Sequence, residues 1–76
     1  MKAFPRITHD PAIMGGKPCI RGMRVTVGMI VKHLAGGYTP ERLLADYPYL
    51  QAEDIREALA YAAWRLDEQE YDLQAA

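Results

Sequence analysis

The sequence predicts a mainly α-helical domain with a small β element, in which a short strand and a β-hairpin precede a three-helix helix-turn-helix unit. Three observations carry this prediction. Thr39–Pro40 and Tyr47–Pro48 mark the start and the end of a short helix. Apolar side chains then recur at helical spacing along residues 52–66. Upstream, Arg21–Gly22 suits a tight hairpin turn, because glycine readily takes the positive φ that such turns need.

The two helices of residues 39–66 are joined by a short turn, so we expect them to cross and pack against each other. The Thr39 hydroxyl is expected to cap the first helix, and Pro40 takes its first position, where the missing N–H costs nothing. The second helix is expected to begin near Ala52. Glu53 and Asp54 lie in its first turn, where negative charge suits the helix dipole.

The longer helix carries apolar residues on two sides. One stripe, expected to face the core, holds Ile55, Leu59, Ala62 and Leu66. Trp64 lies on the opposite side, where a monomer would expose it, and an exposed indole is a favoured anchor for a partner. The alternative is that Trp64 covers the hairpin of its own chain. The predicted partner surface consists of Tyr61, Trp64 and Tyr71, rimmed by Glu57, Asp67, Glu68 and Glu70.

The first third of the chain is expected to form strands and then the remaining helix. Residues 6–9 predict a short edge strand, and residues 17–20 and 23–27 predict the two arms of the hairpin. Thr26 is expected to cap a helix over Val27–Ala35, which Gly36–Gly37 ends. We therefore expect one domain over residues 1–76, with strand and hairpin over 1–26, three helices over 27–66 and an acidic extension over 67–76.

The net charge of −1 hides a strong asymmetry between the two halves of the chain. Residues 1–38 contain six basic groups and one acid, whereas residues 39–76 contain three basic groups and nine acids. Such a division indicates separate partners for the two halves. The alternative is that the halves attract each other within one small fold. A chain of 76 residues without disulfides also often gains stability by oligomerising.

The sequence contains no recognisable catalytic or metal-binding constellation. Neither glycine pair has the spacing or the following residues of a phosphate-binding loop, and His9, His33 and Cys19 lack the spacing of metal ligands. We therefore expect a protein that is not an enzyme and uses no cofactor, metal or small-molecule substrate. The single cysteine suits a reducing compartment, and no apolar run suggests a secretory signal or a membrane span, so we expect a cytoplasmic location.

Nucleic acid is a candidate ligand of the basic half. Ordinary helix-turn-helix docking is disfavoured, because it would bring the acidic start of the last helix to a polyanion. A two-stranded ribbon can enter the major groove instead. The alternative is that these charges are simply solvated. The candidate contacts are Lys17, Arg21 and Arg24 on the hairpin, Lys32 on the first helix and Arg56 on the last.

These residues together resemble the small bacterial proteins grouped as domain-of-unknown-function family 433 (DUF433). The family pattern is a GGKP-x-I-x-G-x-R hairpin, then G-x-(S/T)-x-E, then YP-x-L-x-x-E-x-I-x-x-A-L-x-YA. The resemblance covers about residues 7–63, and Met23 departs from it where the family often has threonine. The matching residues here are Gly15–Pro18, Ile20, Gly22, Arg24, Gly37, Thr39, Glu41, Tyr47, Pro48, Leu50, Glu53, Ile55, Ala58, Leu59, Tyr61 and Ala62.

The resemblance implies a homeodomain-like fold, a homodimer and the role of a VapB-like antitoxin encoded beside a PIN-like ribonuclease toxin. On this hypothesis the basic half binds operator DNA, and the acidic C-terminal helix covers a cationic groove of the toxin. Two alternatives remain. A stand-alone transcriptional regulator would bind DNA without a toxin, and a dimeric structural adaptor would bind no DNA at all.

Overall fold

The structure is a computed structural model that describes the backbone of residues 3–75 and the side chains of residues 3–67. It has three helices, α1 (Val27–Ala35), α2 (Pro40–Asp46) and α3 (Ala52–Ala75), and the predicted threonine caps precede the first two. The Thr26 hydroxyl accepts a hydrogen bond from the amide of Met29, and the Thr39 hydroxyl accepts one from the amide of Arg42. Three helices after a small β element are the predicted fold, which is confirmed.

The β element pairs the two strands β1 (Ile7–Thr8) and β2 (Cys19–Ile20), which run antiparallel with Ile7 opposite Ile20. A short 3-10 turn, η1 (Met14–Gly16), lies between them. The tight turn after β2 is confirmed. Arg21 and Gly22 both have positive φ, 45° and 72°, and the amide of Met23 donates to the carbonyl of Ile20.

The predicted second arm of the hairpin, Met23–Val27, is wrong in its extent. It is reduced to a single bridge between Cys19 and Thr26. The reason is local, because Thr26 caps α1 and the chain therefore enters the helix at Val27. The edge strand predicted over residues 6–9 supplies β1, which is the neighbour of β2 in the sheet.

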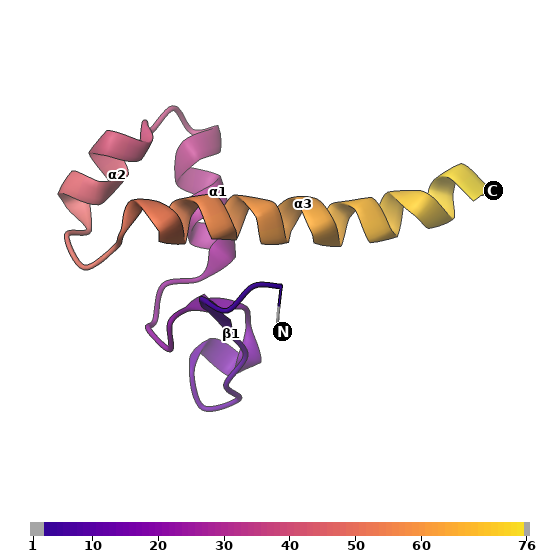
Figure 1. Ribbon diagram of the computed structural model, residues 1–76, viewed down its shortest axis with the longest axis horizontal. Helices are drawn as coiled ribbons and strands as arrows, with labels where there is room; N and C mark the ends of the chain where they lie inside the picture. The colour runs from indigo at the N-terminus through magenta and orange to yellow at the C-terminus, as the bar shows by residue number, and fades with distance from the viewer. Residues whose placement is uncertain (1–2, 76) are drawn as a thin grey trace.

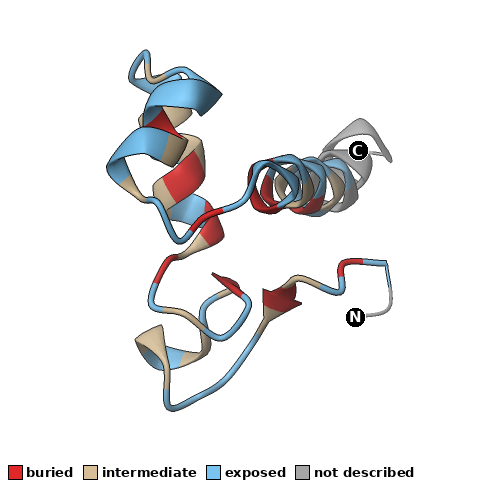
Figure 2. Ribbon diagram, turned by 60° about the vertical axis from the view of Figure 1, so that its left-hand side comes forward, coloured by how far each residue is buried: buried red, intermediate tan, exposed pale blue. Residues whose placement is uncertain are grey.

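Helix α3 packs against α1, α2 and β1, and its second half projects beyond the rest of the chain (Figure 1). Figure 2 shows that the buried parts of the helices and the β element face one another across a single core. Within the described residues, no helix combines the length and the apolar character needed to cross a membrane. The core consists of Phe4, Ile7, Ile20, Val25, Val27, Ile30, Leu43, Leu50, Ile55, Ala58 and Tyr61.

The face of α3 that enters the core differs from the predicted one. Ile55 is buried as expected, but the side chains of Leu59 and Leu66 are 43% and 56% exposed. Ala58 and Tyr61 are buried in their place. The reason is that Phe4 packs against this side of α3, a contact between chain segments too distant for helical spacing to reveal.

Candidate nucleic-acid and partner interfaces

Asp54 is the only buried charged side chain among the described residues, and it joins three segments of the chain. Its Oδ1 accepts hydrogen bonds from Nη1 of Arg6 at 2.8 Å and from Nε of Arg21 at 3.0 Å. Its Oδ2 accepts from Nη2 of Arg21 and from the amide of Gln51, both at 2.9 Å. The carboxylate therefore caps α3 and ties both the N-terminal segment and the hairpin turn to it.

This network holds Arg21, one of the predicted nucleic-acid contacts, in an ion pair. Its guanidinium forks onto Asp54 and also donates to the carbonyl of Tyr49 at 3.0 Å. A phosphate would have to compete with a preorganised bidentate ion pair. Arg21 therefore lies at the surface of the hairpin turn, with 34% of its side chain exposed, but its guanidinium is already paired. Part of the basic half is bonded to the acidic half, as the alternative explanation of the charge asymmetry proposed.

The environment of Asp54 also sets its ionisation. Burial alone would raise the pKa of the Asp54 carboxyl, but the hydrogen bonds from Arg21, the Gln51 amide and Arg6 lower that pKa below its ordinary value. The same bond to Asp54 raises the pKa of Arg21 above its usual value. Both shifts favour the charged pair, so Asp54 is ionised at neutral pH.

The lowered pKa of Asp54 predicts acid-sensitive folding. The unfolded chain takes up the proton at the higher, ordinary pKa of about 3.9, so the ion pairs contribute their full stability above that pH. As pH falls from there through the lower pKa of the folded state, we expect this contribution to disappear. Urea unfolding at several pH values, followed by the fluorescence of Trp64, measures it. Parallel pH profiles for the wild type and Asp54→Asn would contradict the assignment.

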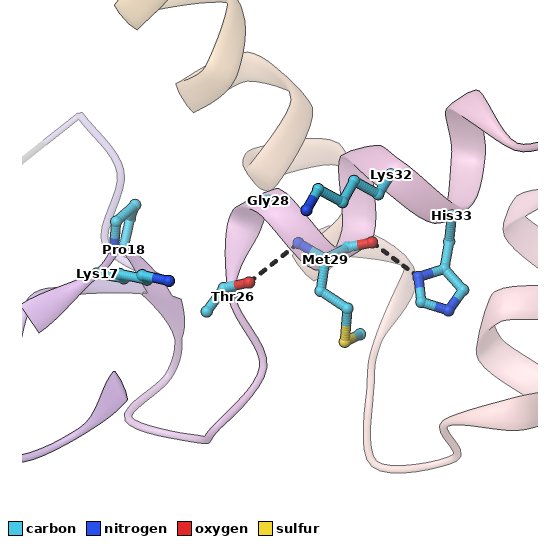
Figure 3. Close-up of a pocket in the computed structure, with 7 residues that line it drawn as sticks. All are labelled: Lys17, Pro18, Thr26, Gly28, Met29, Lys32 and His33. Carbon is cyan, nitrogen blue, oxygen red and sulfur yellow. Dashed lines mark hydrogen bonds between the residues drawn. The ribbon is translucent and has the colours of Figure 1, made fainter. Parts of the chain in front are cut away.

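Two lysines of the predicted surface do come together at an open pocket of about 440 Å³. Lys17 lies at one end and His33 at the other, with Lys32 above the first turn of α1 (Figure 3). Thr26, Gly28 and Met29 complete the wall between them. We call this site the cationic pocket. Its two ammonium groups and the positive end of the α1 dipole suit a phosphate or another anion.

The other two predicted basic contacts, Arg24 and Arg56, do not line the cationic pocket. Arg24 is exposed, and the thiol of Cys19 is buried. Burial raises the pKa of this thiol, and the charges of Arg24 and Lys17 oppose the shift. Arg56 lies on α3 beside Glu53, with 2.9 Å between Nη1 and Oε1, and lines a separate shallow pocket with Phe4. It is therefore not part of the cationic pocket.

Part of the partner surface predicted on α3 is covered by the chain itself. Tyr61 is 3% exposed, and its hydroxyl lies 3.0 Å from Nε2 of His9. Trp64 is half-buried against Phe4 and Tyr61, with ring centroids 5.8 and 5.9 Å away. The carboxylate of Glu57 accepts a hydrogen bond from the backbone amide of Arg6. The predicted placement of Tyr61 is therefore wrong, because the N-terminal segment covers this side of the helix.

The rest of that predicted surface lies farther along α3. Asp67 is exposed, whereas the side chains of Glu68, Glu70 and Tyr71 lie outside the described residues. An apolar groove of about 450 Å³ runs instead along the neighbouring side of α3, where it meets α1. We call it the α1–α3 groove. Its lining consists of His9, Pro18, Val27, Gly28, Val31, Lys32, Tyr61, Ala62, Arg65 and Leu66.

Two features of these surfaces are not evident from the sequence. Asp54 was expected only to favour the α3 dipole, and nothing near it in sequence pointed to Arg6 or Arg21. The exposed leucines of α3 were assigned to the core by their spacing. Among the described residues, no three His, Cys, Asp or Glu side chains gather in a way that would hold a metal ion.

Comparison with known proteins places the chain in a family. Residues 7–62 match the family described as "Protein of unknown function (DUF433)". A crystal structure of a DUF433 member from Anabaena variabilis superposes with a TM-score of 0.77 at 30% sequence identity, covering 91% of this chain and 68% of that one.

The curated relatives carry no described function. The chain is 45% identical over 56 residues to the uncharacterized protein y4eO of Sinorhizobium fredii. It is 38% identical over 60 residues to the uncharacterized protein Rv2308 of Mycobacterium tuberculosis. These matches cover 74% and 79% of this chain but 25% of each relative. The chain thus spans about a quarter of the length of these relatives.

Proposed function

We propose, from the premise that the chain belongs to the DUF433 family, that it is a non-enzymatic, cytoplasmic antitoxin. In this proposal it binds a PIN-like ribonuclease through α3 and operator DNA through the cationic pocket. The observation that carries the proposal is that so small a domain has two exposed surfaces of different chemistry, which meet at Lys32. One is cationic, with Lys17, Arg24 and Lys32, and the other is the projecting half of α3.

The projecting half of α3 supports binding to a protein. The helix continues beyond the elements that pack against its first half (Figure 1). Leu66 is 56% exposed at the edge of the α1–α3 groove, where an apolar side chain of a partner would be desolvated. Asp67 follows it, and the sequence adds acids at 68, 70 and 72. A ribonuclease needs a cationic groove for RNA, and an acidic helix is complementary to such a groove.

The cationic pocket supports binding to DNA by a face other than the usual one. Helices α2 and α3 would form a homeodomain-like helix-turn-helix pair, but Glu53 and Asp54 stand at the start of α3. The nearby arginines are already held in ion pairs with these two carboxylates, so Lys17 and Lys32 are the more available partners for phosphates. A homodimer would double the number of phosphate contacts, and each contact makes affinity more sensitive to salt.

A stand-alone DNA-binding regulator is the second candidate, because the chain by itself exposes Lys17, Arg24 and Lys32. It predicts sequence-specific DNA binding by the purified chain and no stable complex with a ribonuclease. A dimeric adaptor without DNA binding predicts no gel shift even at low salt.

Co-expression with a PIN-like ribonuclease encoded beside this chain tests the proposal. We expect the two proteins to co-purify and the ribonuclease activity to fall. Leu66→Glu is expected to weaken the complex by at least about tenfold, because it places a charge in an apolar contact. Leu59→Glu is the matched control, since Leu59 is also an exposed leucine of α3 but does not line the groove. Equal loss in both variants, or no complex with the wild type, would overturn the proposal.

A further inference from the structure

Aromatic side chains from α1 and from the connections before and after α2 form one cluster beside the cationic pocket. His33 is at its centre, with ring centroids 4.7 Å from Tyr38 and 5.7 Å from Tyr47, both nearly perpendicular. Tyr49 extends the cluster, with its centroid 6.1 Å from that of Tyr47. We call these four residues the aromatic cluster. They lie 16 positions apart at most in sequence, but three separate segments supply them.

Hydrogen bonds of His33 orient the rings of the cluster. Nδ1 of His33 lies 2.8 Å from the carbonyl of Met29, and since a carbonyl only accepts, this nitrogen carries the proton. Nε2 is then free to accept from the Tyr47 hydroxyl, 3.4 Å away. The pattern holds the rings in fixed orientations, so a ligand that stacks on them loses little conformational freedom of the protein.

Part of the cluster is open to solvent. Tyr49 is 51% exposed and so leaves part of its ring accessible to a ligand. The Arg42 guanidinium lies 4.2 Å from the centroid of Tyr38, and the Arg42 side chain is itself 64% exposed. Aromatic rings and planar guanidinium groups are the two side-chain types on which nucleobases stack.

The cationic pocket is continuous with the cluster. His33 and Lys32 line both that pocket and a smaller pocket of about 260 Å³, which Gly36 and Tyr38 complete. Figure 3 shows His33 at the end of the cationic pocket opposite Lys17. A chain of phosphates bound along Lys17 and Lys32 would therefore bring its bases to Tyr38 and the neighbouring rings.

We propose that the aromatic cluster and the cationic pocket together form a binding site for single-stranded nucleic acid, DNA or RNA. A duplex keeps its base faces stacked inside, so it offers phosphates to the lysines but nothing to the rings. An unpaired strand offers both. This inference rests on the nucleic-acid part of the proposed function and specifies its ligand. Asp46 lies 3.9 Å from Arg42 and Glu41 is nearby on α2, so the strand is expected to leave the site before reaching them.

Fluorescence anisotropy of the purified chain with labelled twelve-nucleotide oligo(dT) and oligo(U), and with a duplex of equal length, tests this site. We expect tighter binding to the single strands at low salt. Tyr49→Ala is expected to weaken single-strand binding about tenfold by loss of one stacked base and to leave duplex binding unchanged. Tyr49→Trp is the control that restores an aromatic face. Tyr49 lies in an exposed connection, so we expect both substitutions to leave the fold intact, and circular dichroism checks this.

The double variant Lys17→Glu/Lys32→Glu separates the two proposals. It is expected to abolish binding of single strands and duplex alike, whereas Arg56→Glu, outside the site, leaves both unchanged. Duplex binding lost in the double variant, with no effect of Tyr49→Ala on single strands, would overturn the single-strand site and leave DNA binding in place. No binding of any nucleic acid by the wild type would overturn both.

Discussion

Asp54→Asn is expected to lower the free energy of unfolding by about 2–3 kcal/mol, a large part of the stability of a domain this small. The change keeps the shape of the side chain but removes the charge that Arg6 and Arg21 share. Breaking a buried ion pair costs about 3–5 kcal/mol, and we expect less here because both arginines are about one third exposed to water. Urea unfolding at neutral pH measures the loss.

Glu53→Gln is the matched control for this experiment. Glu53 is the preceding residue in the same first turn of α3, but its pair with Arg56 lies on the surface. Its removal is expected to cost at most about 0.5 kcal/mol. Equal stabilities of the two variants would show that the Asp54 network contributes no more than a surface pair. Asp54→Asn also weakens the restraint on Arg21, so any gain in DNA binding by that variant would reveal that this arginine is held back.

Tyr61→Ala is expected to destabilise the chain by about 3–4 kcal/mol, because it deletes a buried ring. The ring lies 5.4 Å from Phe4 and 5.9 Å from Trp64, centroid to centroid, so the cavity would open between α3 and the N-terminal segment. Thermal unfolding and the emission of Trp64 measure the effect. If Tyr61 instead served a partner surface, the variant would stay stable and lose only partner binding.

Tyr61→Phe distinguishes the ring from its hydroxyl. The phenylalanine keeps the packing and removes only the contact with Nε2 of His9. We expect a loss of about 1 kcal/mol, the usual value for one hydrogen bond. A loss as large as that of Tyr61→Ala would place the stabilisation in the polar contact and contradict the packing argument.

The two surfaces of the chain depend on this core. The Asp54 network holds the hairpin turn against α3, and the turn is next to the strand that leads from Lys17. Phe4 and Tyr61 fix the side of α3 that faces the body, and this choice turns Leu66 to the solvent. Variants of the core and variants of the surfaces are therefore to be compared at equal folded fractions.

By itself the sequence determined the three helices, the caps of the first two and the hairpin turn. A threonine cap, a proline or a glycine acts on backbone groups within about four residues, so its effect is the same in any fold. The tertiary structure alone decided which side of α3 is buried and which arginines are available. These outcomes depend on Asp54 meeting Arg21 and Arg6, which are 33 and 48 positions away. Helical spacing defines the stripes of a helix, but only packing against distant segments selects the one that is buried.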